Sequence, residues 1–440
     1  MGNKRVLIIS HNPLSDQDNN GKTLSSFMRE WPRPKIAQIY LSPGDPSFSI
    51  CENFFQITDI SALKGFVTGK KAQGNLVQKA NSTKVKLDKE RLHRNRFYII
   101  VRDIFQTRSS LAYYARSIVW RSKRWLTSEL ARWLDDFQPE VILFQSSNCD
   151  FAFDIVNFVS RKYNIPVVME VTDDYVTKKF TINPWFWINL RRLTQRFVSM
   201  VRMADCVIVI GDKMFKEYSR RFGGKYYVAM NSVHIDDNKN VGASKDSNLK
   251  LVYTGNIGLN RWRILKEIGN SLNRFNQSHQ QKATLEIYSL DKPDSNILSS
   301  LNNTGASKFM GSATSKEIDR IRDSAEILVH VESFDKKNKY ITRLSVSTKI
   351  PEYMASAKCI LAIGPKDVAS IEYLLEEKVA HVLTSVERGS LDAGVEEILV
   401  DSRLRENIAK NALYVARSNH DINKIRKDIH KYLNGISNDQ

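Results

Sequence analysis

The feature that most constrains the fold of this chain is a regular alternation of short apolar runs with amphipathic helical stretches. Examples of the apolar runs are RVLIIS (5–10), EVILFQS (140–146) and CVIVI (206–210), and each leads into a polar turn and then helical periodicity. Short runs that are apolar on both faces are typical of parallel strands covered by helices on both sides. The pattern therefore predicts an α/β protein built from Rossmann-like, doubly wound sheets.

The alternation comes in two series, separated by the polar stretch DNKNVGASKDSN (237–248). A length of 440 residues also exceeds what one ordinary core holds. We therefore expect two tandem domains that face a central cleft, because ligands bind at the carboxyl ends of the strands in such sheets. The predicted parts are an N-terminal domain at 1–236, a linker at 237–248, a C-terminal domain at 249–415 and a helical tail at 416–440.

The net charge of +18 is concentrated in two segments, 91–125 and 178–202, which carry fourteen of the eighteen surplus positive charges. Both segments are rich in aromatic residues, and we expect helices at about 96–107 and 110–136 in the first and near 185–204 in the second. Cations mixed with Trp and Tyr favour an anionic membrane surface, and the alternative is that the aromatic residues form core beside a solvated face of cations. The candidate anchors are Trp120, Trp125, Trp185 and Trp187.

The remaining sequence signals concern location and thiol chemistry. No apolar run approaches the ~20 residues that span a bilayer, and the first run is too short for a secretory signal. We expect a cytoplasmic protein, peripheral at the inner face of the membrane. The four cysteines lie far apart in or beside apolar stretches, which predicts buried structural thiols rather than a zinc site.

One stretch of the C-terminal half, STKIPEYMASAKCILAIGP (347–365), combines a predicted helix start with a lysine. Ser347 or Thr348 can cap the helix, and its free N–H groups form an anion site. A lysine is electrostatically unfavourable at a helix N-terminus unless an anion is present, so Lys349 is a candidate phosphate ligand. An ordinary solvated lysine beside a cap explains the local sequence equally well.

This stretch resembles the donor-binding segment of GT-B glycosyltransferases, especially the retaining family-four enzymes of bacterial surface polysaccharide synthesis. LVYTGNIGLNRWRIL (251–265) is similar to the first strand and loop of their C-terminal domain, and MNSVHID (230–236) to the end of their N-terminal domain. FMGSATSKEIDRIRDSAEILVHVES (309–333) is similar to the segment before the donor motif. The resemblance implies a glycosyltransferase that needs no cofactor or metal beyond its nucleotide-sugar co-substrate.

The resemblance also assigns residues to the donor site. Arg261 and Lys349 would hold the diphosphate of the donor, and Glu352 would accept hydrogen bonds from the ribose hydroxyls. The implied donor-binding set is Gly255, Asn256, Gly258, Arg261, Ser347, Thr348, Lys349 and Glu352. The chain departs from the family motif at two positions. The family has a first glutamate eight positions before the second, and Leu344 stands there in this chain, while Glu332 is too far upstream to replace it. The glycine of the family's ASGK motif is Ala357 here.

The N-terminal domain offers further candidates at the ends of predicted strands. Asp173 and Asp174 follow the strand VVMEV, where paired carboxylates can orient an acceptor hydroxyl, act as a general base, bind a metal or cap the next segment, and we favour contact with the acceptor. The polar loop and helix start after the first strand contain His11, Gly21 and Lys22. This segment resembles the glycine loop that faces the cleft in this fold, and an ordinary turn between a strand and a helix is the alternative. Asp173, Asp174, Arg261 and Lys349 are the candidate catalytic residues.

The resemblance implies transfer of a hexose from a nucleotide-diphosphate sugar to a saccharide acceptor in polysaccharide biosynthesis, such as that of capsule or lipopolysaccharide. The basic aromatic segments favour an acceptor that is carried on a lipid. Arg261 and Lys349 would stabilise the departing diphosphate, and an inverting reaction with an aspartate base remains an alternative. The rival functions are a nucleotide-sugar epimerase of the same fold and a basic nucleic-acid-binding protein. No nucleic-acid-binding module is recognisable, so no nucleic acid partner is expected.

Overall fold

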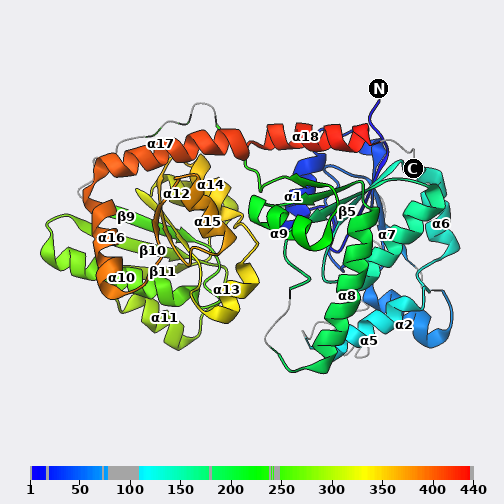
Figure 1. Ribbon diagram of the computed structural model, residues 1–440, viewed down its shortest axis with the longest axis horizontal. Helices are drawn as coiled ribbons and strands as arrows, with labels where there is room; N and C mark the ends of the chain where they lie inside the picture. Colours follow the sequence, from blue (N-terminus) through cyan, green and yellow to red (C-terminus); the bar gives the residue numbers. More distant parts are fainter. Residues whose placement is uncertain are drawn as a thin grey trace. The chain divides into compact units, whose positions relative to one another are not determined.

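The computed structural model describes residues 2–15, 19–71, 74–77, 109–177, 181–236, 239, 241 and 248–436. It divides into two compact units (Figure 1). Unit 1 comprises residues 1–229 together with 425–440, and unit 2 comprises residues 230–424. We had placed the linker at 237–248 and a separate tail at 416–440. Most of the linker lies outside the described residues, and the tail is divided between the units within one helix, α18 (Ile422–Gly435).

Unit 1 is built on an eight-stranded sheet in the order β4-β3-β2-β1-β5-β6-β7-β8, in which β4 is antiparallel to β3 and the other pairs are parallel. The strands are β1 (Val6–Ser10), β2 (Ile36–Tyr40), β3 (Asn53–Gln56), β4 (Asn75–Val77), β5 (Val141–Gln145), β6 (Val167–Val171), β7 (Cys206–Val209) and β8 (Tyr226–Val228). The helices are α1 (Asn19–Met28), α2 (Asp59–Thr68), α5 (Ser110–Arg121), α6 (Ser128–Phe137), α7 (Asp150–Tyr163), α8 (Pro184–Met203) and α9 (Asp212–Phe222). Ile425, Ile429 and Leu433 of α18 pack into the same core as β1 and β2, which explains why the end of the chain belongs to unit 1.

Unit 2 is built on a six-stranded parallel sheet in the order β11-β10-β9-β12-β13-β14. The strands are β9 (Asn248–Thr254), β10 (Lys282–Tyr288), β11 (Ser307–Gly311), β12 (Ile327–Val331), β13 (Cys359–Ile363) and β14 (His381–Leu383). The helices are α10 (Arg261–Ser278), α11 (Ser295–Asn302), α12 (Ser315–Asp323), α13 (Lys336–Thr342), α14 (Lys349–Ala355), α15 (Ala369–Glu376), α16 (Arg388–Val400) and α17 (Ser402–Asn419). The predicted fold class, two Rossmann-like α/β units in tandem, is confirmed.

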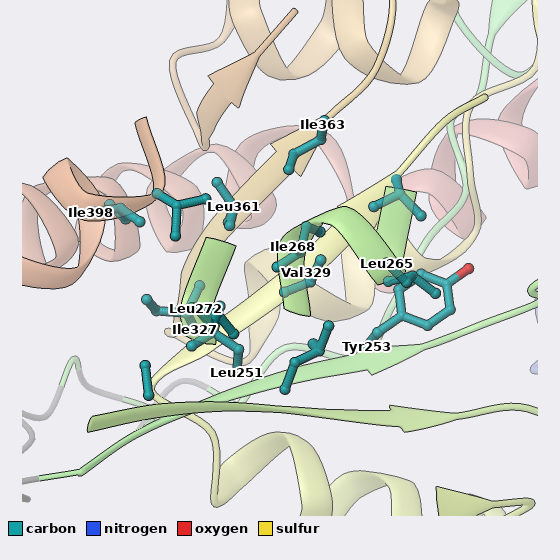
Figure 2. Packing of buried hydrophobic residues seen from close by; sticks show 14 of the residues in the cluster. Leu251, Tyr253, Leu265, Ile268, Leu272, Ile327, Val329, Leu361, Ile363 and Ile398 are labelled. Atoms are coloured by element: carbon teal, nitrogen blue, oxygen red, sulfur yellow. The ribbon is translucent and has the colours of Figure 1, made fainter. Parts of the chain in front are cut away.

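The core of unit 2 forms where α10 and α16 pack on one face of this sheet (Figure 2). Leu251, Ile327 and Leu361 contribute from β9, β12 and β13, and Ile268 and Ile398 from the two helices. The apolar positions of α10 recur every three to four residues, so one stripe of the helix meets the sheet and leaves its polar side outside. This packing fixes where α10 begins, and therefore where Arg261 lies.

Each sheet has a point where the chain changes direction across it, between β1 and β5 in unit 1 and between β9 and β12 in unit 2. The loops after the two strands diverge there and leave a crevice at their carboxyl ends, which is where doubly wound sheets bind ligands. In unit 1 this position is reached by His11 and the start of α7. In unit 2 it is reached by the loop before Arg261 and by Glu332.

The predicted single helix at 110–136 is wrong, because the structure has two helices, α5 and α6, with a break at 122–127. Lys123 adopts a left-handed backbone conformation with φ 54°, which ends the first helix. The Thr127 side chain then accepts a hydrogen bond from the Leu130 N–H at 3.1 Å and caps the second. The predicted helix at 96–107 lies outside the described residues.

Candidate functional site

The loop between β9 and α10 is held by an aspartate that the sequence did not single out. Asp291 accepts hydrogen bonds from the Ile257 N–H at 2.8 Å and from the Asn256 side chain at 3.0 Å. The Gly258 N–H donates to the Asn256 side-chain oxygen at 2.7 Å, and a Cβ at position 258 would lie only 2.6 Å from that oxygen. A larger residue at 258 would have to displace the Asn256 side chain and its hydrogen bond to the loop, so glycine lets these contacts form on the way to Arg261.

Arg261, the first residue of α10, forms an ion pair with Glu332 just beyond the end of β12. The guanidinium Nη2 lies 2.9 Å from Glu332 Oε2, and the two side chains are 17% and 3% exposed. Burial alone raises the pKa of Glu332, but His330, 3.4 Å away, and Arg261 outweigh it and hold that pKa below its usual value. The carboxylate is therefore charged, and it fixes one end of a guanidinium that retains some exposure.

Lys349 and Glu352 lie together at the start of α14 and share a third charged partner. Lys349 Nζ is 3.2 Å from Glu352 Oε2, and Arg322 Nη1 is 2.5 Å from the same oxygen. The anion beside Lys349 in this structure is thus a carboxylate of its own helix. The Ser347 hydroxyl accepts a hydrogen bond from the Lys349 N–H at 3.3 Å, whereas Thr348, the N-cap residue, makes no side-chain cap.

Tyr353 ties this short helix to the end of β9. Its hydroxyl accepts a hydrogen bond from the Thr254 N–H at 3.0 Å and donates to the Thr254 carbonyl at 3.2 Å. The strand end that leads to Arg261 and the helix that carries Lys349 and Glu352 are therefore parts of one buried framework. The predicted donor residues of unit 2 are brought to the same edge of one sheet.

The two departures from the resembled motif have clear structural outcomes. Leu344, which replaces the first glutamate, is buried, so it presents no polar group to a ligand. Ala357 follows α14 with φ 57°, the left-handed conformation that glycine adopts at this position without steric cost. The backbone thus keeps the motif's conformation although the residue has changed.

A cavity of about 260 Å³ lies between the first turns of α10 and the loop after β12. Phe334 is the aromatic residue of its lining. The lining residues are Asn260, Arg263, Ile264, Glu267, Ser333, Phe334, Asp335 and Val386. The sequence did not single out these residues, although for Ser333, Phe334 and Asp335 the position just after a buried strand was a usable signal.

The candidates of unit 1 occupy three different settings. Asp174 accepts a hydrogen bond from the Tyr218 hydroxyl at 2.8 Å and another from Thr177, and its side chain is almost fully buried, whereas Asp173 is exposed. Gly21 lies inside α1, where a Cβ would lie 2.4 Å from the Pro13 carbonyl oxygen, and its neighbour Lys22 is exposed. The environment of Asp174 favours a structural role for it, and that of Gly21 shows a packing requirement.

His11, the remaining candidate of unit 1, contacts residues that the sequence did not connect with it. Its Nδ1 lies 3.6 Å from the Cys149 sulfur, and the Arg116 guanidinium donates to the same sulfur at 3.4 Å.

Glu170, near the end of β6, is a further residue that the sequence did not single out. Burial raises its pKa to about 7, although the Gln145 side chain donates a hydrogen bond to it at 3.0 Å. A lone acid inside the apolar run VVMEV was the available signal.

The two basic aromatic segments are only partly described, since 91–108 and 178–180 lie outside the described residues. Trp120 and Trp125 are buried, so their prediction as membrane anchors is wrong, and Arg116 is buried in an ion pair with Asp59 at 2.7 Å. Trp185 and Trp187, at the start of α8, are exposed. Within the part of the chain that the structure describes, no helix is long and apolar enough to cross a bilayer.

Three neighbouring helices, α2, α5 and α8, bring exposed apolar side chains together at one end. The Asn189 side chain donates to the Ser110 carbonyl at 2.6 Å, which places the starts of α5 and α8 side by side, and Asp59 bonds to Trp120 at 2.8 Å, which sets α2 antiparallel to α5. We call the exposed group at this end the apolar tip. It consists of Phe66, Val67, Leu111, Trp185, Trp187 and Ile188, with the exposed cations Lys64, Lys70, Lys71 and Arg191 on the same helices or the turn after α2.

Comparison with known proteins gives matches at the level of structure. No family model matches the sequence, and no curated protein matches it either. Anabaena HepE in complex with UDP is 13% identical, with a TM-score of 0.60 and coverage of 98% of this chain and 100% of that chain. An α,α-trehalose-phosphate synthase (UDP-forming) from Burkholderia xenovorans is 10% identical, with a TM-score of 0.57 and coverage of 98% and 100%. Sucrose-phosphate synthase from Thermosynechococcus elongatus is 11% identical, with a TM-score of 0.57 and coverage of 97% and 98%. Likeness over nearly the full length of these proteins identifies the fold as GT-B.

Proposed function

We propose that this protein is a glycosyltransferase that moves a hexose from a nucleotide-diphosphate sugar to a saccharide acceptor. The observation that carries the proposal is the grouping of Arg261, Lys349 and Glu352 at the carboxyl edge of the unit 2 sheet, tied together through Tyr353 and Thr254. The two cations suit the negative charges of a diphosphate, and the carboxylate suits the hydroxyls of a ribose. The cavity of about 260 Å³ between the first turns of α10 and the loop after β12 has room for part of the nucleotide.

In this proposal Arg261 and Lys349 stabilise the negative charge that develops on the leaving diphosphate. Glu332 holds Arg261 in place, so the guanidinium needs little reorganisation when the donor binds. Lys349 exchanges its contact with Glu352 for a phosphate oxygen, and Glu352, still held by Arg322, turns to the ribose hydroxyls. The two side-chain cations supply the charge stabilisation that other transferases obtain from a metal, and the reaction retains the anomeric configuration.

UDP-glucose is the first donor to test, because HepE has been solved with UDP and with UDP-glucose. On this proposal the loop glycines 255 and 258, with Asn256, position the backbone beside the diphosphate, and Ser347 and Thr348 line its other side. Asp173, the exposed member of the aspartate pair, contacts the acceptor, with His11 and Lys22 on neighbouring strand ends or helices of unit 1.

The acceptor we propose is a lipid-linked saccharide of bacterial surface polysaccharide synthesis, met at the inner face of the cell membrane. The apolar tip supports this acceptor, because exposed tryptophans beside lysine and arginine suit the interface of an anionic bilayer. Each cation near such a surface contributes about 1 kcal/mol.

The test of the function is incubation of the full chain with UDP-glucose, with and without a lipid-linked saccharide. We expect UDP to be released and a glucosylated product to form only when the acceptor is present, because transfer needs a hydroxyl to attack the sugar. In a parallel thermal-shift measurement, UDP at 100 times its dissociation constant should stabilise the protein by about 2.7 kcal/mol. A changed sugar nucleotide without acceptor would indicate the epimerase instead, and no stabilisation by any of the common nucleoside diphosphates would refute the donor site.

Replacement of Glu352 by glutamine tests the ribose contact. We expect Glu352→Gln to weaken UDP binding by about 10-fold, since a charged hydrogen bond is worth ~1.5 kcal/mol or more, and to change binding of the 2′,3′-dideoxy analogue less than about 2-fold. Calorimetry on both ligands measures this, with Glu376→Gln, an exposed glutamate of α15, as the matched control. Equal losses for the two ligands would assign Glu352 a structural role through Arg322.

A further inference from the structure

The second topological switch point of the protein, between β1 and β5 of unit 1, holds a cluster that the proposed transfer reaction does not use. Cys149 immediately precedes α7 and is the N-cap residue of this 14-residue helix, with no side-chain cap hydrogen bond. The Arg116 guanidinium donates to its sulfur at 3.4 Å, and His11 Nδ1 approaches the sulfur at 3.6 Å. A guanidinium, an imidazole and the positive end of a helix thus converge on one thiol.

We propose that Cys149 is a reactive thiolate site, which small uncharged electrophiles and hydrogen peroxide modify in preference to the other three cysteines. The convergence of positive groups on the sulfur favours the thiolate, and the thiolate is the nucleophilic form of cysteine. The site takes a small ligand, because the sulfur is almost fully buried and lies 3.6 Å from His11 Nδ1 and 3.8 Å from the side-chain oxygen of the exposed Asn148.

The positive groups are themselves held in place, so the cluster is preorganised. Arg116 Nε donates to Asp59 at 2.7 Å, and the Arg116 guanidinium lies 4.8 Å from the centre of the Phe151 ring. Asp59 is in turn bound by the Trp120 indole N–H at 2.8 Å. The guanidinium is therefore held by Asp59 and Phe151, and its Nη1 donates to the Cys149 sulfur.

Among the residues that the structure describes, the charged and titratable groups around the sulfur are Arg116, His11, Asp59 and Tyr175, and their balance favours the anion. Burial raises the pKa of Cys149, Arg116 and His11 lower it, Asp59 raises it slightly, and the result is a pKa of about 7. Tyr175, on the loop after β6, also feels the sulfur, and its pKa is raised mainly by burial, so it stays neutral near pH 7. Asp150 of α7 is engaged by the Ser117 hydroxyl at 2.7 Å and by Arg196 at 3.7 Å.

The other three cysteines provide controls within the same chain. All four are free thiols, and their exposed fractions are 0% for Cys51, 2% for Cys149, 5% for Cys206 and 3% for Cys359. Burial raises the pKa of Cys51 and Cys359 to about 12 and that of Cys206 to about 11. Because the four are almost equally buried, a difference in their reaction rates reports thiolate chemistry rather than exposure.

With hydrogen peroxide the step is a two-electron oxidation of the sulfur. The thiolate donates an electron pair to one peroxide oxygen, an S–O bond forms and the O–O bond breaks. The other oxygen leaves as hydroxide and takes a proton from solvent, so the products are a sulfenic acid at Cys149 and water. With iodoacetamide the sulfur displaces iodide and forms a thioether.

The test is competitive modification of the folded full chain, followed by mass spectrometry of its cysteine peptides. With iodoacetamide at pH 7.5 we expect Cys149 to react at least 10-fold faster than each of the other three cysteines, with a rate that rises through a midpoint near pH 7. With peroxide and a sulfenic-acid trap such as dimedone, the adduct should appear at Cys149 first. Equal rates for the four thiols, earlier modification of Cys206, or no modification of Cys149 in the folded chain would each overturn the proposal.

Two variants assign the cause. His11→Gln should slow the reaction of Cys149 at pH 7 and move its midpoint to higher pH, because the imidazole no longer stabilises the anion, while Lys216→Gln, at an exposed lysine of α9, should leave both unchanged. The melting temperature checks that the fold is kept. An unchanged midpoint in a folded His11→Gln variant would overturn the role of the imidazole, and the order of reaction in the unaltered chain decides the proposal in either case.

Discussion

Replacing Arg261 with alanine is expected to weaken UDP binding by about 10- to 150-fold, the largest loss we predict for a single side chain of the donor site. The reason is the removal of a charge-assisted contact worth ~1.5–3 kcal/mol from a site where Glu332 has already oriented the guanidinium. Isothermal titration calorimetry with UDP measures the loss. Arg320→Ala, an exposed arginine of α12, is the matched control and should bind UDP as the unaltered protein does.

The same variant should also destabilise unit 2, because it leaves the carboxylate of Glu332 buried without its cation. Breaking a buried pair in this way costs ~3–5 kcal/mol. The double variant Arg261→Ala/Glu332→Gln removes the unpaired charge, so it should recover most of the stability but none of the UDP affinity. Recovery of binding in the double variant, or unchanged binding in the single one, would contradict the assignment of Arg261 to the diphosphate.

Much of the fold could be predicted from the sequence because buried parallel strands are short, apolar and followed by helices. The expected helix near 185–204 is α8 at Pro184–Met203, for example, and the predicted strands around Leu7, Leu143 and Leu361 are all present. The break at 122–127 could not be predicted in the same way. Nothing in the composition of that stretch required Lys123 to adopt a left-handed conformation, and its amphipathic pattern continues across the turn.

The candidate site was predictable where its residues follow one another along the chain, and not where they meet through the fold. Arg261, Lys349 and Glu352 were inferred from short motifs, and the structure places all three in unit 2. Asp291 comes from a segment with no motif, and Arg322 from a stretch (309–333) in which the resemblance assigns no residue a role. Their partners become apparent only through hydrogen bonds to Ile257 and Glu352. Glu332 was considered only in the register of a family motif, whereas in the structure its role follows from the ion pair with Arg261.

The tryptophans of the basic segments show the limit of composition as a guide, and they give the second large prediction. Trp120 is 1% exposed, stacks on Phe151 with ring centres 4.1 Å apart and donates its indole N–H to Asp59. Trp120→Ala should therefore lower the free energy of unfolding by ~3–5 kcal/mol, because it leaves a large cavity and removes the indole hydrogen bond to Asp59, which keeps its contact with Arg116. Denaturant unfolding followed by circular dichroism measures this, and a loss below ~1 kcal/mol would contradict the packing.

Trp187, by contrast, is 40% exposed at the apolar tip, so its replacement separates membrane binding from stability. Trp187→Ala should change the free energy of unfolding by less than ~1 kcal/mol but lower co-sedimentation with anionic vesicles several-fold, since an interfacial aromatic anchor is lost.

The cations of the apolar tip can be tested in the same assay. The triple variant Lys64→Gln/Lys70→Gln/Arg191→Gln should bind anionic vesicles more weakly than the unaltered protein at 0.1 M salt, and the difference should be much smaller at 1 M. The Debye length falls from ~10 Å to ~3 Å over that range and screens the attraction in the unaltered protein as well. Equal binding of the unaltered protein to anionic and neutral vesicles would reject the electrostatic part of the anchor. Absence of binding to either would remove the membrane from the proposal and direct the search for the acceptor to soluble saccharides and sugar phosphates.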